Sequence, residues 1–79
     1  MTSKKDVGAR LKRWRKLNKL RLVDVSELID VSQGSLSDLE NGNSYPSAQT
    51  LMALALQGVN LHELLGVPMP SVPRTAKVN

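Results

Sequence analysis

Cysteine is absent from the 79 residues of this chain, which excludes disulfide bonds and thiolate metal sites. Histidine occurs once, as His62, and a single imidazole cannot build a metal site. Long apolar runs are also missing, because the longest stretch, Leu51–Leu56, is far too short to span a bilayer. Lys4 and Lys5 are followed by no apolar segment of the kind that directs secretion. We therefore expect a cytoplasmic protein without a metal centre.

The length of the chain limits the functions that it can carry. Seventy-nine residues make one small domain and leave no room for a separate catalytic domain. Ser26, Ser35 and Ser37 have no histidine or lysine base at a recognisable spacing, which argues against a catalytic nucleophile. No carboxylate cluster suggests a nuclease metal site. The sequence therefore predicts a protein that is not an enzyme, and no motif implies a small-molecule cofactor.

Basic residues are missing from most of the chain, since no lysine or arginine occurs from Leu22 to Pro73. That stretch contains six carboxylates, at Asp24, Glu27, Asp30, Asp38, Glu40 and Glu63. The basic residues are concentrated near the N-terminus, at Lys4, Lys5, Arg10, Lys12, Arg13, Arg15, Lys16, Lys19 and Arg21. We therefore expect two faces of opposite charge. A clustered basic face favours a polyanionic partner such as DNA or RNA, but charge alone fits a solvated helix surface equally well.

Helix-start signals and apolar spacing predict three helices in the first half of the chain. Ser3 and Asp6 have the spacing of a capping box, and apolar residues at helical spacing extend a first helix over about Lys4–Asn18. A short second helix is expected over about Leu22–Ile29. A third is expected over about Ser32–Asn41, because it begins at a serine cap and ends at an Asn-Gly pair.

Two more helices are predicted in the second half. Ser47 is a suitable cap for a fourth helix over Ala48–Gln57, whose residues are apolar nearly all round. We expect this helix to be the most buried one, with Met52 in the core. Asn60 begins a last short helix that ends at Leu65.

The fold class that follows is all-α, a compact five-helix bundle. The helices occupy residues 4–66. Residues 67–79 contain three prolines and few large apolar groups, so we expect them to form an extended or disordered tail or linker.

The second and third helices have the spacing of a helix-turn-helix. Counting from Leu22, the fifth residue is Ser26, which is small where two helices must cross closely. The ninth is Asp30, a residue type that tolerates a left-handed turn better than most. Leu36 and Leu39 are spaced to hold the third helix against the core. Two short helices joined in this way commonly place side chains in the major groove of DNA.

Five short motifs carry a family resemblance. They are Arg10-Leu11-x-x-x-Arg15, Leu28-Ile29-Asp30-Val31-Ser32, Leu36-Ser37-x-Leu39-Glu40-Asn41-Gly42, Pro46-Ser47 and Gly58-Val59-x-Leu61-x-Glu63-Leu64-Leu65. Through them, Val7 to Gly66 resembles the helix-turn-helix domain of lambda-type repressors and Cro proteins, the Xre family of bacterial and phage transcription regulators. The resemblance implies a lambda-repressor-like fold and a structural ion pair between Arg15 and Glu40.

The exposed face of the third helix is expected to read DNA bases. With Leu36 and Leu39 inward, the helical repeat turns outward the four candidates, which are Gln33, Gly34, Ser37 and Asp38. Gln33 is the first choice, because a glutamine can bind adenine N6 and N7 together. Gly34 allows close approach of the backbone to a base. Asp38 has two equally open interpretations: an acceptor for cytosine N4 or an exposed residue without a contact.

A second set of residues is expected to contact phosphates. The resemblance places such contacts in the loop after the third helix and at the start of the second, with further candidates on the first and third helices. In this sequence the set is Arg10, Lys12, Arg21, Ser35, Asn41, Asn43, Ser44 and Tyr45. Side chains and backbone amides at these positions would fix the register of the protein on DNA without reading its sequence.

Three positions depart from the family pattern. At Leu22 the family commonly has a glutamine that binds the DNA backbone, at Arg21 a serine or threonine cap, and at Asp30 a glycine. We expect the basic residues before Arg21 to compensate, since the salt dependence of affinity has a slope of about −0.9 per neutralised phosphate.

The leading functional hypothesis is a sequence-specific transcriptional regulator of the phage repressor type. Two copies would bind a palindromic operator in double-stranded DNA, with half-sites one helical turn apart. The resemblance implies a bacterial or phage-encoded protein that associates with the nucleoid when bound. The homodimer would use Leu61, Leu64 and Leu65 of the last helix or a C-terminal domain outside this chain.

The alternative is a protein-binding module with the same fold, such as an adaptor, an antirepressor or an antitoxin-like subunit. It is favoured by Leu22 in place of a polar residue and by Asp38 on the reading face. The absence of basic residues from Leu22 to Pro73 also favours it.

Overall fold

The computed structural model describes residues 3–68 and contains all five expected helices. They are α1 (Lys4–Leu17), α2 (Leu22–Leu28), α3 (Gln33–Glu40), α4 (Ala48–Leu56) and α5 (Leu61–Leu65). No strand occurs in this range, which confirms the all-α fold class. Within it, no helix has the length and apolar character needed to cross a bilayer. Residues 69–79 of the expected tail lie outside the described part.

Side-chain caps explain where four of the helices begin. At α1, the Ser3 hydroxyl accepts a hydrogen bond from the Asp6 backbone at 3.1 Å, and the Asp6 carboxylate accepts one from the Ser3 backbone. The other expected caps accept the same bond from the backbone three residues ahead: Ser32 of α3, Ser47 of α4 and Asn60 of α5. Each cap satisfies a backbone donor that the first helical turn leaves unpaired.

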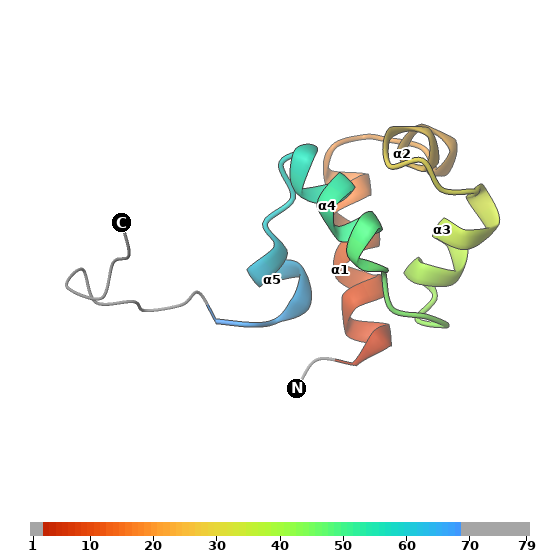
Figure 1. Cartoon of the computed structure of the whole chain (residues 1–79). Coiled ribbons are helices and arrows are strands. Elements are labelled where there is room, and N and C mark those ends of the chain that lie inside the picture. The colour runs from red at the N-terminus through yellow and green to blue at the C-terminus, as the bar shows by residue number, and fades with distance from the viewer. Residues whose placement is uncertain (1–2, 69–79) are drawn as a thin grey trace.

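Helix α1 runs through the middle of the bundle (Figure 1). In that view α4 crosses in front of it, with α3 on one side and α5 on the other. Both α3 and α5 pack directly against α1, and α2 packs against α3. The buried apolar core takes residues from every helix, from the C-cap of α2 and from the α4–α5 connection: Val7, Leu11, Val25, Ile29, Leu36, Leu39, Leu54, Val59 and Leu64.

The prediction that α4 is the most buried helix was wrong. Of its residues only Thr50 and Leu54 are buried, while the side chains of Met52 and Leu56 are 67% and 85% exposed. A helix that is apolar on all sides can still pack only one of its faces against the core of such a small bundle. No described element covers the other face of α4, so the apolar side chains there stay exposed. The assignment of Met52 to the core is therefore incorrect.

The turn between α2 and α3 has the expected geometry. Asp30 adopts a left-handed conformation with φ of 56°, as its position in the motif predicts. Ser26 is buried, and its hydroxyl donates to the Val23 carbonyl at 2.8 Å. The Val31 backbone then donates to the Ser26 carbonyl at 2.9 Å, which closes the turn.

Helices α1 and α3 lie in very close contact at Gly8. A Cβ atom at this position would overlap the carbonyl oxygen of Leu39 and lie 2.7 Å from that of Glu40. The hydrogen of glycine is therefore what allows the C-terminal end of α3 to lie directly against α1. No local sequence pattern around Gly8 predicts this requirement, because the contact lies on a helix about thirty residues further along the chain.

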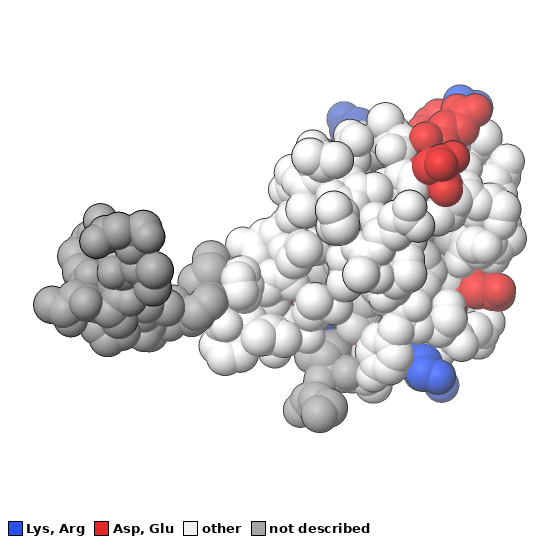
Figure 2. Space-filling model, viewed as in Figure 1, with Lys and Arg blue, Asp and Glu red and all other residues white. Residues whose placement is uncertain are grey.

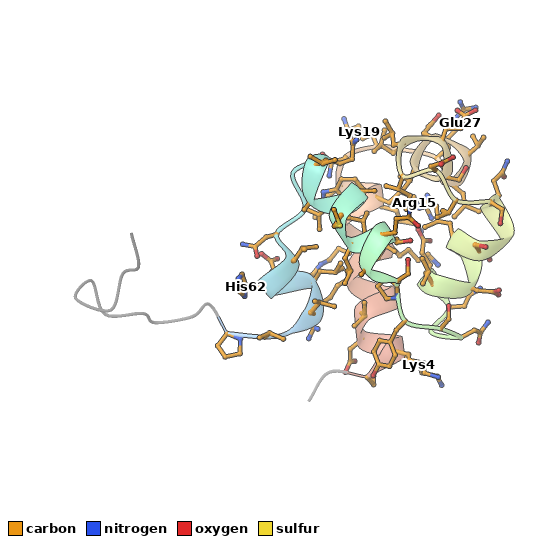
Figure 3. The ribbon with its side chains drawn as sticks, viewed as in Figure 1. Lys4, Arg15, Lys19, Glu27 and His62 are labelled. Carbon is orange, nitrogen blue, oxygen red and sulfur yellow. The ribbon has the colours of Figure 1, made fainter. Side chains whose placement is uncertain are left out.

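Arg15 and Glu40 connect the same two helices. The Arg15 Nε donates to Glu40 Oε2 at 2.7 Å and its Nη2 to Oε1 at 2.9 Å, while Nη1 donates to the Leu20 carbonyl at 3.1 Å. Figure 3 shows Arg15 pointing into the middle of the molecule. The hydrogen bond to Glu40 raises the pKa of Arg15, while partial burial opposes this effect.

We expect Gly8→Ala to lower the free energy of unfolding by about 2 kcal/mol, because the new methyl group meets two backbone carbonyls that cannot move independently. Urea unfolding followed by circular dichroism measures the change. The matched control is Gly34→Ala, since a Cβ at Gly34 meets only the Ser32 hydroxyl, at 4.0 Å. Equal stability of the two variants would contradict the close contact at Gly8.

We expect Arg15→Ala to lower the free energy of unfolding by about 3 kcal/mol, because it leaves the Glu40 carboxylate unpaired in a buried position. The double variant Arg15→Met with Glu40→Leu removes both charges and should recover most of this loss. Urea unfolding of both proteins tests the interpretation. If the double variant is less stable than Arg15→Ala, an uncompensated charge is not the cause of the loss.

Candidate nucleic-acid interface

Helix α3 presents a polar face on the side away from the core. Leu36 and Leu39 are buried, so the other side of the helix is turned outward. The four expected base-reading residues lie there: Gln33, Gly34 and Asp38 are exposed and Ser37 is half-buried. The structure therefore brings these four residues to one surface.

Gln33 and Gly34 make up the first turn of this face. Among the described residues, the Gln33 carboxamide has no hydrogen-bond partner, so both its donor and its acceptor are available to a ligand. The space beside the Gly34 Cα is open apart from the Ser32 hydroxyl. The turn can thus offer one bidentate side chain next to an accessible stretch of backbone.

The serine hydroxyls of α3 are partly engaged within the protein. Ser35 lies in the capping turn, where its hydroxyl accepts a hydrogen bond from the Ser32 hydroxyl at 2.9 Å. The Ser37 hydroxyl accepts one from the Asn41 side chain at 3.3 Å. Each of the two acceptors keeps its own hydrogen, which a base edge or a phosphate can accept.

Asp38 connects the outward face of α3 to the loop that follows this helix. Its carboxylate accepts a hydrogen bond from the Asn43 side chain at 3.4 Å, and its carbonyl accepts one from the Asn43 backbone at 2.9 Å. Asn43 therefore partly satisfies the carboxylate whose role the sequence left open.

The loop after α3 lies beside the N-terminus of α1. Gly42 adopts φ of 78° and packs against Lys5 so closely that a Cβ atom there would clash with it. The Lys4 ammonium lies 5.8 Å from the centre of the Tyr45 ring, within the range of a cation–π contact, and Figure 3 shows Lys4 at this end of α1. Lys4 and Lys5, which the sequence analysis did not assign to the site, thus lie beside the loop that is expected to contact phosphates. Ser44, another expected contact residue of this loop, is half-buried.

Arg21 meets an acidic partner at the start of α2. Its backbone donates to the Asp24 carboxylate at 2.8 Å, and its guanidinium donates at 3.1 and 3.0 Å. These bonds lower the pKa of Asp24 and raise the pKa of Arg21. Asp24 therefore supplies the reciprocal half of a capping box, although the Arg21 side chain makes no cap hydrogen bond of its own. Asp24 also offsets the charge of a residue expected to contact phosphate. This pair was not predicted from the sequence, although the three-residue spacing of Arg21 and Asp24 is a signal that could have indicated it.

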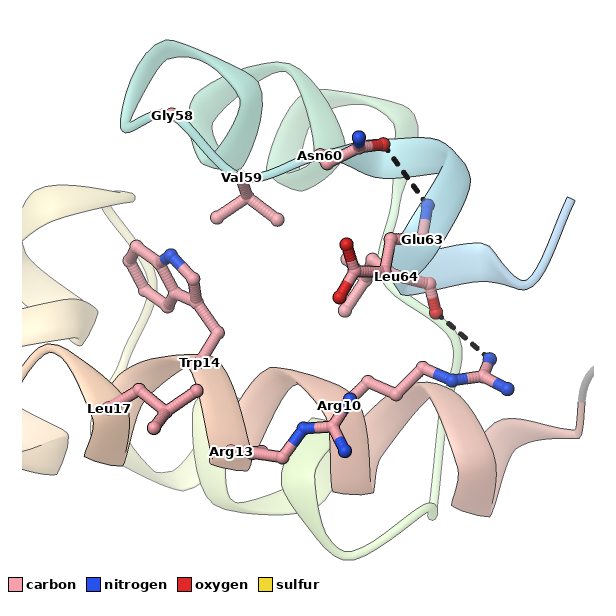
Figure 4. Close-up of a pocket in the computed structure, with 9 residues that line it drawn as sticks. All are labelled: Arg10, Arg13, Trp14, Leu17, Gly58, Val59, Asn60, Glu63 and Leu64. Carbon is pink, nitrogen blue, oxygen red and sulfur yellow. Dashed lines mark hydrogen bonds between the residues drawn. The ribbon is translucent and has the colours of Figure 1, made fainter. Parts of the chain in front are cut away.

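One of the two phosphate candidates of α1, Arg10, is directed toward α5 and away from α3. The Arg10 guanidinium donates to the Leu64 carbonyl of α5 at 3.3 Å (Figure 4). Lys12 is exposed on α1 and makes no hydrogen bond or ion pair with the described residues. Contact with Leu64, far along the chain, has no signal in the local sequence.

Charge is distributed unevenly over the surface. The face in Figure 2, which α4 crosses, shows charged atoms only near its margins, and acidic groups gather over α2. Helix α1 contains most of the described basic residues but no acidic residue after Asp6. Within the described residues, the basic groups are thus concentrated on α1 and the acidic groups lie mostly outside it. The formation of two faces of opposite charge stays a prediction.

Comparisons with known proteins agree with this geometry. A family model described as helix-turn-helix matches residues 11–57, more than half of the chain. The HTH-type transcriptional regulator DdrOP3 of Deinococcus deserti is 42% identical over 57 residues, which cover 71% of this chain and 44% of that regulator. The chain thus spans less than half the length of this relative. No solved structure matches this chain. The chain belongs to the helix-turn-helix family of Xre and lambda-repressor type.

Proposed function

We propose that this protein is a DNA-binding transcriptional regulator that reads the major groove with α3. The observation that carries the proposal is the exposed first turn of α3, where the Gln33 carboxamide has no partner among the described residues and Gly34 leaves the backbone accessible. The inward side of the same helix is fixed by Leu36 and Leu39, and by the ion pair of Glu40. A rigid helix with free polar groups is what direct readout of bases requires.

The finer proposal is a phage-type repressor that binds a palindromic operator as a homodimer. The short length of α3 supports this proposal, because one short helix contacts only a few base pairs. A second copy on a paired half-site would extend the contact. Leu64 is buried in the core, so it is not available for the dimer contact; of the expected residues, only the half-buried Leu61 and Leu65 remain. The cytoplasm, where DNA is accessible, is the proposed location.

A protein-binding role is the second candidate. It is favoured by the pairing of Arg21 with Asp24, which reduces the charge available to phosphate at the start of α2. The exposure of Met52 and Leu56 also favours it, because large apolar side chains on a surface mark sites of protein contact when they form a patch.

We expect Gln33→Ala to relax the base preference at one position of each half-site. Loss of a bidentate contact to adenine corresponds to about 1 to 3 kcal/mol of discrimination. Selection of bound sequences from a random pool of duplex DNA, at low and moderate salt, measures the preference. The matched control is Gln49→Ala, which removes an exposed glutamine from α4.

The selection has three informative outcomes. An enriched palindrome whose preference changes at one position only in Gln33→Ala supports readout by α3. An identical preference in both variants would exclude Gln33 as a reading residue. If the folded wild-type protein enriches no sequence, the proposal that this chain recognises an operator is wrong.

We expect Asp24→Asn to strengthen binding to duplex DNA and to steepen its salt dependence. The amide can still accept the backbone hydrogen bond of Arg21, but it no longer offsets the charge of the guanidinium. One additional phosphate contact changes the slope of log K against log salt concentration by about −0.9. The control is Glu27→Gln, which makes the same change of charge on α2 without a hydrogen bond to Arg21. Equal slopes for the two variants would contradict a specific effect at Arg21.

A further inference from the structure

Two hollows lie side by side on the C-terminal half of α1. The first, about 210 Å³, opens between α1 and the α4–α5 connection, and Trp14, Val59 and Glu63 line it (Figure 4). The second lies along α1 itself and is lined by Lys12 and Lys16 among others. Arg13 and Leu17 line both hollows, so the two form one continuous surface, which we call the α1 groove.

Apolar side chains form the centre of the α1 groove. Figure 4 shows the Trp14 indole facing Val59 across the first hollow. Leu17, at the boundary of the two hollows, is 75% exposed, although leucine gains free energy when its surface is removed from water. The groove therefore contains both an exposed apolar side chain and a recess next to it.

Basic side chains surround this apolar centre. Arg10, Arg13, Lys12 and Lys16 line one or the other hollow, and Glu63 is the acidic residue among the lining residues. Arg10 also donates to the Leu64 carbonyl, which fixes its guanidinium at the edge of the groove. The excess of positive charge favours an acidic ligand.

The centre of the α1 groove lies on the opposite side of α1 from α3, while Lys12 lines the edge nearer to α3, since it is four residues from Gly8. Helix α3 contacts α1 at Gly8 and Arg15, which share one face because they are seven residues apart. Arg13 and Leu17, four residues apart, share another face, about half a turn away at roughly 100° per residue. A ligand in the groove would therefore leave the reading face of α3 uncovered.

We propose that the α1 groove binds an acidic segment of a protein partner that carries leucine-like side chains. Such a segment would place apolar groups beside Leu17 and Trp14 and carboxylates beside Arg13 and Lys16. Duplex DNA fits less well, because its phosphates offer no apolar group for the recess. The proposal does not depend on operator recognition, since the groove and α3 occupy different faces.

Trp14 is the single tryptophan of the chain, so its fluorescence reports directly on the first hollow. The probe is a short synthetic helical peptide with leucines on one face and glutamates beside them. We expect a saturable change in Trp14 emission in the absence of DNA. Two control peptides, one with lysine in place of each glutamate and one with alanine in place of each leucine, should each bind at least about tenfold more weakly.

Variants of the full chain identify the residues involved. We expect Leu17→Ser and Arg13→Gln each to weaken binding of the acidic peptide about fivefold or more, because one removes apolar contact and the other removes charge. Both side chains are exposed, so circular dichroism should show an unchanged fold. Met52→Ser, which removes a similarly exposed apolar side chain of α4 outside the groove, should leave the affinity unchanged.

Three results would overturn the proposal. The first is tight binding of the lysine peptide, which would show that the charges do not select the ligand. The second is an equal loss of affinity in Leu17→Ser and Met52→Ser. The third is a stronger response of Trp14 to duplex DNA than to the peptide, with loss in Arg13→Gln and none in Leu17→Ser, which would assign the groove to phosphates.

Discussion

The buried contact of Arg15 with Glu40 connects three parts of this small protein. One guanidinium binds both carboxylate oxygens at the end of α3 and the Leu20 carbonyl before α2. Its planar set of donors matches this arrangement, which a lysine could not reproduce. Gly8, two turns earlier on α1, lets the same end of α3 lie directly against this helix. The position of α3 therefore depends on this ion pair and this glycine together with the buried Leu36 and Leu39. None of these groups belongs to the outward face that is proposed to read DNA.

Much of the fold followed from local signals. The caps Ser3, Ser32, Ser47 and Asn60 predicted four helix starts, because each cap acts on the turn directly after it. The exposed face of α3 followed from its two buried leucines. The burial of α4 was mispredicted, since an all-round apolar pattern does not say which face meets the core. The contacts of Gly8 with α3 and of Arg10 with α5 could not be predicted either, because they join helices that are distant in the sequence.

Separate faces of α1 serve different parts of the molecule. One side holds α3, and the opposite side carries the α1 groove, with its basic and apolar side chains. The acidic residues lie mainly beyond α1, and one of them, Asp24, offsets a basic residue at the start of α2. A protein with a single core can in this way present two chemically different surfaces without interference between them.

Gly8 has a consequence for how proteins of this kind can diverge. Because no side chain fits between α1 and the end of α3, the distance between these helices is at its minimum and cannot be adjusted in small steps by exchanging residues there. A descendant with a new binding preference must change the side chains that α3 displays and keep the helix in place. The base-reading role proposed for Gln33 can thus change by exchange of that one exposed side chain, while the helix packing behind it has to stay constant.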